Sequence, residues 1–310
     1  MPIFGDLQGP VFSTQSASMG ERLFLRLEDD PLHGPESAMP AGTLRAFPVS
    51  AALRGHVSHV MLYRETFAEG HEMRERVLPD GAVRLVFNFG DAPSAGSSDG
   101  GGLAVEAIGA SAAPVVVRMR RKVEGLSVTL RAGAAASLLG LPAGEIGGGA
   151  VHLDALWRGE GSALLERMAE MPDDAGRVAL LQAALLHRLG DNRIAAGNDI
   201  AMQAARLIAE AEGRLRLRDV ASTVGVGERR LQQLFHAHVG LSPRAWSRLA
   251  RMHGCLRALR RRPVPAWAEV ALEGGFYDQS HLVNEFRALC GVTPTEFLGR
   301  AASGSSKTGG

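Results

Sequence analysis

Short runs in which hydrophobic and polar positions alternate occupy the first half of the chain, and this pattern indicates β-strands. The alternation is clearest in residues 126–130, whose sequence is LSVTL. The runs that predict strands are 21–27, 57–67, 83–89, 115–119 and 125–130. Turn-forming segments separate them at 78–81, 91–102 and 113–114. Several short strands at this spacing predict a cupin-like barrel or a sandwich, with residues 1–45 poorly assigned.

The apolar period becomes helical after Gly133. The segments that predict helices are 134–140, 160–171 and 174–189. In the last of these, apolar residues recur at i, i+3, i+7 and i+11, which places them on one face. They are Val178, Leu181, Leu185 and Leu189. Two interpretations of this face stay open: it covers the sheet, or it forms a homodimer interface within residues 160–190.

An internal repeat occupies the last hundred residues. Residues 220–246 match residues 270–297 when one extra residue is allowed in the second copy. The matched pairs are Ala221 with Ala271, Gly225 with Gly275, Val226 with Phe276, Leu231 with Leu282, Phe235 with Phe286, Gly240 with Gly291, Leu241 with Val292, Ser242-Pro243 with Thr293-Pro294, and Trp246 with Phe297. Since the matched residues are mostly small, glycine or apolar, what repeats is a packing scheme rather than a surface.

Each repeated position has a physical reason in a helix-turn-helix. Two helices that cross at a steep angle need a small residue where they touch, and Ala221 supplies it. The tight turn needs a backbone that accepts positive φ, which Gly225 provides. Gly240 stands where the second helix should end, and Ser242-Pro243 form an N-cap followed by proline at the first helical position. The sequence therefore predicts a helix-turn-helix, written twice.

The stretch from Ser242 to about Arg261 joins the two units and predicts one helix. Twenty residues at about 1.5 Å each make about 30 Å, close to one turn of B-DNA at about 34 Å. Such a rod would present two recognition helices to successive major grooves.

The predicted fold class is α+β, with a β-rich region and its covering helices followed by an all-α domain. We predict that the β-rich region spans residues 1–192, a linker residues 193–198, the double helix-turn-helix residues 199–298, and a disordered tail residues 299–310.

These features resemble the AraC/XylS family of bacterial regulators. The resemblance rests on residues 217–235, on GLSP at 240–243, on GFYDQSHL at 275–282 and on GVTP at 291–294. Residues 75–81 (ERVLPDG), 85–90 (LVFNFG) and 131–136 (RAGAAA) are similar to a β-rich sensor domain in one branch of that family. The resemblance implies a sequence-specific transcription regulator, in most relatives an activator that recruits RNA polymerase. It also implies a sensing or dimerising N-terminal domain, but no particular ligand.

Side chains in the first turns of each second helix are the candidates for base contacts, because these turns enter the major groove. Arg pairs with guanine, and Gln or Asn pairs with adenine. The predicted base contacts are Arg229, Gln232 and Gln233 in the first unit and Gln279, Ser280, His281 and Asn284 in the second. Many relatives carry Arg at the position of Asn284, so the second unit is expected to bind more loosely. The predicted phosphate contacts are Arg230, Arg244, Arg248 and Arg251.

Charge supports a nucleic-acid partner for the C-terminal part. Residues 198–298 hold 14 Arg against 10 Asp plus Glu, while residues 1–197 hold 18 Lys plus Arg against 23 acidic residues. Taken alone, such an excess of positive charge marks a solvated surface as often as it marks a nucleic-acid interface. With no signal peptide and no apolar run long enough to span a membrane, we expect a cytoplasmic, nucleoid-associated protein.

A small-molecule effector is the other expected partner. If the β-rich region encloses a pocket, its predicted lining is Phe87 and Phe89, with Arg84 as a polar anchor; alternatively, the two aromatics are core and Arg84 is surface. His56 and His59 are three residues apart, but a third histidine and a carboxylate at metal-site spacing are missing. We therefore predict no metal and no cofactor.

Enzyme motifs are also missing. The sequence contains no Walker loop, no GxSxG and no HExxH. Cys255 and Cys290 fall in the predicted linking helix and second unit, where we expect them to be packing residues. We predict that the chain is not an enzyme. Two alternatives stay open: an enzyme fused to a DNA-binding module, and an architectural DNA-binding protein without a sensor.

Overall fold

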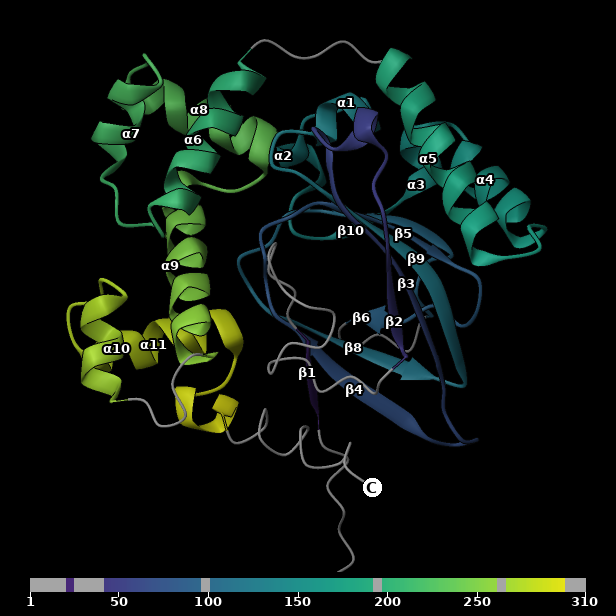
Figure 1. Ribbon diagram of the computed structural model, residues 1–310, viewed down its shortest axis with the longest axis horizontal. Coiled ribbons are helices and arrows are strands. Elements are labelled where there is room, and N and C mark those ends of the chain that lie inside the picture. Colours follow the sequence, from purple (N-terminus) through teal and green to yellow (C-terminus); the bar gives the residue numbers. More distant parts are fainter. Residues whose placement is uncertain (1–20, 25–41, 96–100, 192–196, 261–265, 299–310) are drawn as a thin grey trace, which may run out of the picture.

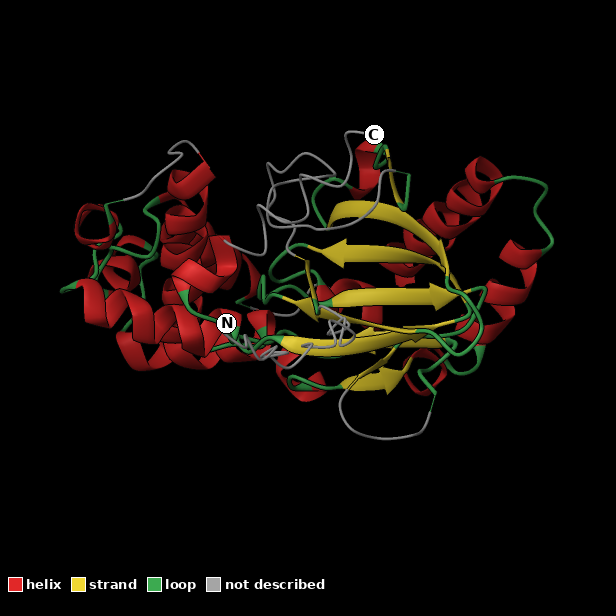
Figure 2. Ribbon diagram, turned by 90° about the horizontal axis from the view of Figure 1, so that it is seen from below, coloured by secondary structure: helices red, strands yellow, loops and turns green. Residues whose placement is uncertain are grey.

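The computed structural model describes residues 21–24, 42–95, 101–191, 197–260 and 266–298. Strands occupy the middle of the molecule and a group of helices stands beside them (Figure 1, Figure 2). The predicted tail at 299–310 and most of the predicted linker lie outside the described residues. The predicted fold class is confirmed: a β-rich N-terminal region precedes an all-helical C-terminal region.

The described strands form two sheets. The larger sheet has the order β10-β7-β5-β9-β3-β2 and the smaller has the order β1-β4-β8-β6. Neighbouring strands are antiparallel except β1 and β4, which are parallel. Their bounds are β1 Arg22–Phe24, β2 Leu44–Phe47, β3 Val57–Thr66, β4 Glu72–Val77, β5 Arg84–Asn88, β6 Ser94–Ala95, β7 Val105–Ile108, β8 Val115–Arg120, β9 Lys122–Leu130 and β10 Ala150–His152. The predicted strands correspond to β1, β3, β5, β8 and β9.

Helices cover the outer face of the larger sheet. They are a 3-10 turn η1 at Ala51–Leu53, α1 Ala135–Leu139, α2 Ala143–Ile146, α3 Leu153–Trp157, α4 Glu160–Ala169 and α5 Asp174–Asp191. Val178, Leu181 and Leu185 of α5 are buried in the core shared with the sheet. The apolar face predicted for this helix therefore covers the sheet and is not free for a partner.

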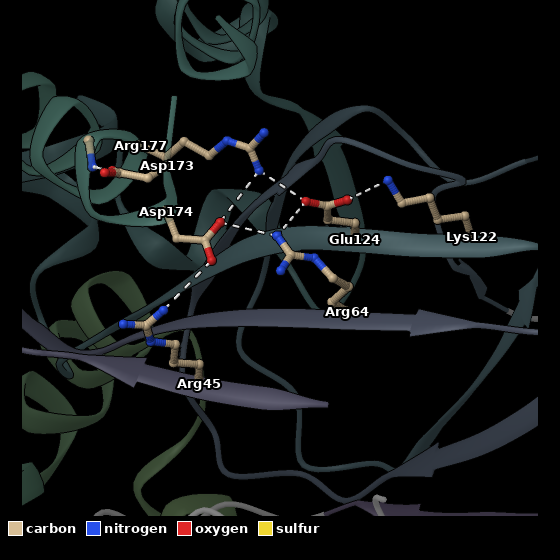
Figure 3. Close-up of polar contacts among 8 residues, drawn as sticks. Arg45, Arg64, Lys122, Glu124, Asp173, Asp174 and Arg177 are labelled. Carbon is tan, nitrogen blue, oxygen red and sulfur yellow. Dashed lines mark hydrogen bonds and ion pairs between the residues drawn. The ribbon is translucent and has the colours of Figure 1, made fainter. Parts of the chain in front are cut away.

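Ion pairs fix α5 to β9 and β3 of the larger sheet (Figure 3). Glu124 of β9 pairs with Arg64 of β3 at 2.8 Å and with Arg177 of α5 at 2.9 Å. Asp174, the first residue of α5, pairs with Arg64 at 3.1 Å. Burial alone would raise the pKa of Glu124, but hydrogen bonds from Lys122, Arg64 and Arg177 lower this pKa to about 2.

The C-terminal region consists of helices arranged about one long rod. They are α6 Asn198–Glu210, α7 Leu217–Thr223, α8 Glu228–Val239, α9 Pro243–Arg260, α10 Trp267–Glu273 and α11 Gln279–Cys290. In Figure 1, α9 stands between the group α6–α8 and the pair α10–α11. None of the helices in the described part of the chain is long and apolar enough to cross a membrane.

Candidate nucleic-acid interface

The first helix-turn-helix unit consists of α7, a four-residue turn and α8. Ala221 is buried where the two helices meet, and Gly225 adopts a φ of 73° in the turn. Leu231 and Phe235 lie on the buried face of α8. Gly240 ends α8 in the left-handed region with a φ of 87°. Because these side chains fix one face of α8 inward, the opposite face of its first turns is presented to solvent.

The second unit, α10 and α11, repeats the arrangement. Ala271, Leu282 and Phe286 are buried, and Gly275 has a φ of 70°. Its turn is one residue longer than that of the first unit, which accounts for the inserted residue in the repeat. The Asp278 side chain caps α11 by accepting a 2.7 Å hydrogen bond from the His281 backbone N–H. The predicted double helix-turn-helix is thus present in both copies.

A single helix, α9, joins the units as predicted. The Ser242 hydroxyl accepts a hydrogen bond from the Ala245 backbone N–H at 3.1 Å, and Pro243 is the first helical residue. Eighteen residues at about 1.5 Å each make the rod about 27 Å long. Cys255 on α9 and Cys290 on α11 are both buried in the core of the second unit, and burial raises the pKa of Cys255 to about 12.

Most predicted base contacts lie on exposed surface. Arg229, Gln232 and Gln233 are exposed on the first turns of α8. On α11, Gln279, Ser280 and Asn284 are exposed.

His281 differs from this group because neighbouring residues hold its ring. Its Nδ1 accepts a 3.2 Å hydrogen bond from the Tyr277 backbone N–H, and the ring packs edge-on against Phe276. This arrangement fixes the direction of the ring, and its Nε2 lies 4.0 Å from Oε1 of Glu285. The adjacent Tyr277 side chain is 91% exposed, and the sequence analysis did not single it out.

The four predicted phosphate contacts have different environments. Arg230 and Arg244 are exposed. Arg248 donates a 2.6 Å hydrogen bond to Glu285 of α11 through Nε, so a phosphate would compete with this ion pair. Arg251 donates to the Gly213 carbonyl oxygen at 3.1 Å and lies over the Phe276 ring. This side chain therefore packs the helices against each other, and its phosphate contact stays a prediction.

The N-terminal region contributes directly to the core of the second unit. Leu23 of β1 and Leu78, which follows β4, are 2% exposed and belong to the same apolar cluster as Leu249, Phe276 and other residues of the second unit. Burying a leucine side chain stabilises a contact by about 1.5–3 kcal/mol. The β-rich region and the second unit therefore share a core.

The turn at residues 78–81 packs against the linking helix α9. His253 Nε2 lies 3.0 Å from the Pro79 carbonyl oxygen. A Cβ on Gly81 would lie 2.6 Å from Cζ3 of Trp246 and 3.0 Å from Cδ1 of Leu249. The sequence indicated a turn here but not this contact. The one available signal was the glycine, whose φ of 75° and missing side chain the contact requires.

The first unit also contacts the N-terminal region. Helix α8 packs on α1 and α2. A Cβ on Gly144 of α2 would lie 2.7 Å from the His236 carbonyl oxygen, and one on Gly240 would lie 3.1 Å from Cβ of Ala110. Both units are therefore held by the β-rich region as well as by α9.

Two cavities adjoin the β-rich region. One, of about 540 Å³, lies between the larger sheet and helices α6 and α9, with Arg84, Thr129, Met202 and Trp246 in its lining. The other, of about 600 Å³, lies between the two sheets. Among the described residues no group of three His, Cys, Asp or Glu side chains could hold a metal ion.

The predicted ligand-pocket residues lie on opposite faces of β5. Arg84 lines both cavities and pairs with Asp80. Phe87 is fully buried in the core beneath the helices, and Phe89 packs against that core with Arg177 over its ring. The pocket prediction for Phe87 and Phe89 is therefore wrong. Side chains of a strand alternate between faces, so residues 84 and 87 cannot share one.

Two family profiles match the chain. Residues 220–300 match a helix-turn-helix domain, and residues 45–152 match a domain of unknown function, DUF6597. No curated protein matches the chain at a significant level.

Solved structures with similar arrangements include the C-terminal domain of AraT, a response regulator from Geobacillus stearothermophilus. It has 22% identity and a TM-score of 0.30, covering 34% of this chain and 87% of that one. ToxT from Vibrio cholerae has 12% identity and a TM-score of 0.43, covering 78% and 97%. Wild-type ToxT with a bound unsaturated fatty acid has 12% identity and a TM-score of 0.44, covering 77% and 94%.

Proposed function

We propose that the chain is a DNA-binding transcription regulator of the AraC/XylS type that activates transcription in response to a small molecule. The two helix-turn-helix units and the helix-turn-helix profile matched by residues 220–300 support this proposal. In this proposal α8 and α11 enter successive major grooves on one face of double-stranded DNA. The observation that carries it is the exposed polar surface on the first turns of both recognition helices, which are linked by one rigid rod.

The proposed base contacts are Arg229, Gln232 and Gln233 from α8, together with Gln279, Ser280, His281 and Asn284 from α11. Arg230 and Arg244 contact phosphates, and Arg248 joins them when it releases Glu285. These phosphate contacts supply affinity without sequence information, whereas the base contacts supply specificity. The β-rich region binds the effector, and RNA polymerase is the second macromolecular partner. The protein acts at the nucleoid in the cytoplasm, and no step of the proposal requires catalysis.

The proposal includes homodimerisation through residues 160–190, but only part of the surface of this segment can contact a partner. Since the apolar face of α5 covers the sheet, a partner would contact the opposite face, where Leu186 is 38% exposed. The proposed linker at 193–198 then separates the dimerising region from the DNA-binding domain at 199–298.

Selection of DNA from a random pool by the full-length protein tests the proposal. Two enriched subsites, centred about 10–10.5 base pairs apart, are expected from recognition helices one helical turn apart. Equal retention of all sequences would contradict sequence-specific recognition and favour an architectural role.

A further inference from the structure

The cavity between the two sheets has a mostly apolar lining. Its volume of about 600 Å³ falls within the range of small-molecule pockets, about 300–1,000 Å³. Apolar side chains from both sheets surround it: Met61, Val86 and Ile108 from the larger sheet, and Val77, Val117 and Met119 from the smaller. A bound molecule would therefore need a hydrocarbon portion of its own.

Most charged side chains of this lining are already paired. Arg84 pairs with Asp80, and Arg64 pairs with Glu124. Glu65 and Glu75 share one guanidinium, that of Arg22, at 2.8 and 3.0 Å. Two carboxyl groups already occupy this guanidinium, and burial raises the pKa of Glu75. An anionic ligand would therefore find no unpaired arginine among the described residues of the lining.

Glu106 of β7 is the exception among the charged residues of the lining. Its strand neighbours Val105 and Ala107 are buried beneath the helices, so its own side chain faces the cavity. Within the described residues, its carboxyl group has no hydrogen bond or ion pair. Its register partner on β10 is His152, whose Nδ1 accepts a 3.3 Å hydrogen bond from the Asp154 backbone N–H instead. Tyr63 lines the same cavity, and burial first and then the charge of Glu106 raise the pKa of Tyr63. The Tyr63 hydroxyl donates its own hydrogen bond to Asn88 and is not a donor to Glu106.

Glu106 is half-buried, and a carboxylate that loses part of its water without gaining a donor is less stable until a cation or a hydrogen-bond donor reaches it. Burial accordingly raises the pKa of Glu106 to about 7. A cationic group beside Glu106 would restore the ionised form and be held by it. The cavity thus combines an apolar wall with one unsatisfied acidic group.

We propose that the cavity between the sheets binds an organic cation, with its ammonium group against Glu106 and its hydrocarbon portion among the apolar side chains of both sheets. This inference rests on the sensing role in the proposed function and names the chemical class of the effector. Because binding requires the ionised carboxylate, it releases a proton at neutral pH. The affinity should fall as the pH decreases below about 7.

Calorimetric titration of the full-length protein with n-octylammonium tests this, with n-octanoate and 1-octanol as probes of matched length. We expect octylammonium to bind at least tenfold more tightly than either, and Glu106→Gln to remove this preference. Glu69→Gln makes the same chemical change at an exposed position between β3 and β4 and should leave binding unchanged. If Glu106→Gln does not fold, the decrease in wild-type affinity between pH 8 and pH 6 provides the test.

Three results would overturn the proposal: no binding of octylammonium, equal or tighter binding of octanoate, or octylammonium affinity that neither Glu106→Gln nor pH alters. DNA selection by the same preparation distinguishes this failure from a failure of the proposed function. Enriched subsites without octylammonium binding would contradict only the proposed class of effector. Loss of sequence selection would contradict the proposed role as a transcription regulator.

Discussion

Replacing Gly81 by alanine should loosen the contact between the β-rich region and the linking helix. Gly81 follows β4 in the turn at 78–81, and its φ of 75° lies in the left-handed region. An alanine in that conformation costs about 1–2 kcal/mol whatever its surroundings. The new Cβ would also lie 2.6 Å from Cζ3 of Trp246.

The Trp246 ring cannot easily move away from this methyl group. Its Nε1 donates a 3.0 Å hydrogen bond to the Ala205 carbonyl oxygen, and its ring packs edge-on against Phe235 at 6.2 Å. Inserting a methyl group into a packed contact costs about 1–3 kcal/mol. The total expected for Gly81→Ala is therefore about 2–5 kcal/mol, and only the second part depends on the contact between the regions.

Gly70→Ala is the matched control, because Gly70 has a φ of 74° and a Cβ added there would have nothing within 4 Å. Urea unfolding would measure both free energies, and hydrogen exchange would report on the amides of α9. We expect Gly81→Ala to lower the free energy of unfolding by about 1–3 kcal/mol more than Gly70→Ala does, and to accelerate hydrogen exchange in α9. Equal losses in the two variants, with unchanged exchange in α9, would refute the packing of this turn against the helix.

Three further predictions follow from single side chains. Glu124→Gln should lower the free energy of unfolding at pH 7 by about 1–2 kcal/mol, discounted for solvent from an upper limit of about 3 kcal/mol. Because the pKa of Glu124 is lowered in the folded state, its stabilisation is complete above the unfolded pKa and is lost as the pH falls from about 4.5 to about 2. In urea unfolding, the stabilities of wild type and Glu124→Gln should therefore be closer at pH 3 than at pH 7. Arg244→Ala should reduce the salt dependence of DNA binding by about one unit of slope, and Arg251→Ala should lower stability instead; equal slopes in wild type and Arg244→Ala would remove Arg244 from the interface. Cys255 and Cys290 should react with a maleimide only after unfolding, because both are buried, and rapid modification of the native protein would contradict that burial.

The helix-turn-helix units could be predicted because their signals are local and occur twice. Gly225 and Gly275 are required by the turns themselves, and Gly240 and Gly291 end the second helices in the left-handed region. Each signal is contained within a few residues of the feature that it specifies. Repetition in register made chance agreement implausible.

Strands with mixed polarity were missed for an equally physical reason. Four of the six residues of β4, Glu72–Val77, are charged, so no apolar alternation marks it. The strand is nevertheless central in its sheet, between β1 and β8, because Glu75 is paired with Arg22. A charge neutralised by a residue more than fifty positions away leaves no signal in the local sequence.

The contacts between the two regions could not be predicted for a similar reason. Leu78 belongs to a turn when only its neighbours are considered, yet it is buried in the core of the second helix-turn-helix unit. The error for Phe87 and Phe89 could have been avoided, since the two-residue period of a strand separates them from Arg84. Pairing and burial across the chain, rather than local propensity, determine these parts of the site.

The most direct test of the central claim is a paired DNA titration of wild type, Gln232→Ala and the control Gln203→Ala. Gln203 is also an exposed glutamine, but it lies on α6 outside the recognition helices. The DNA would be the sequence that the wild type selects and a scrambled version, at one salt concentration. We expect Gln232→Ala to lose about 1–3 kcal/mol of binding free energy on the selected sequence only, with relaxed preference at one or two base pairs. Equal losses on both DNAs, or no loss on either, would contradict base recognition by α8.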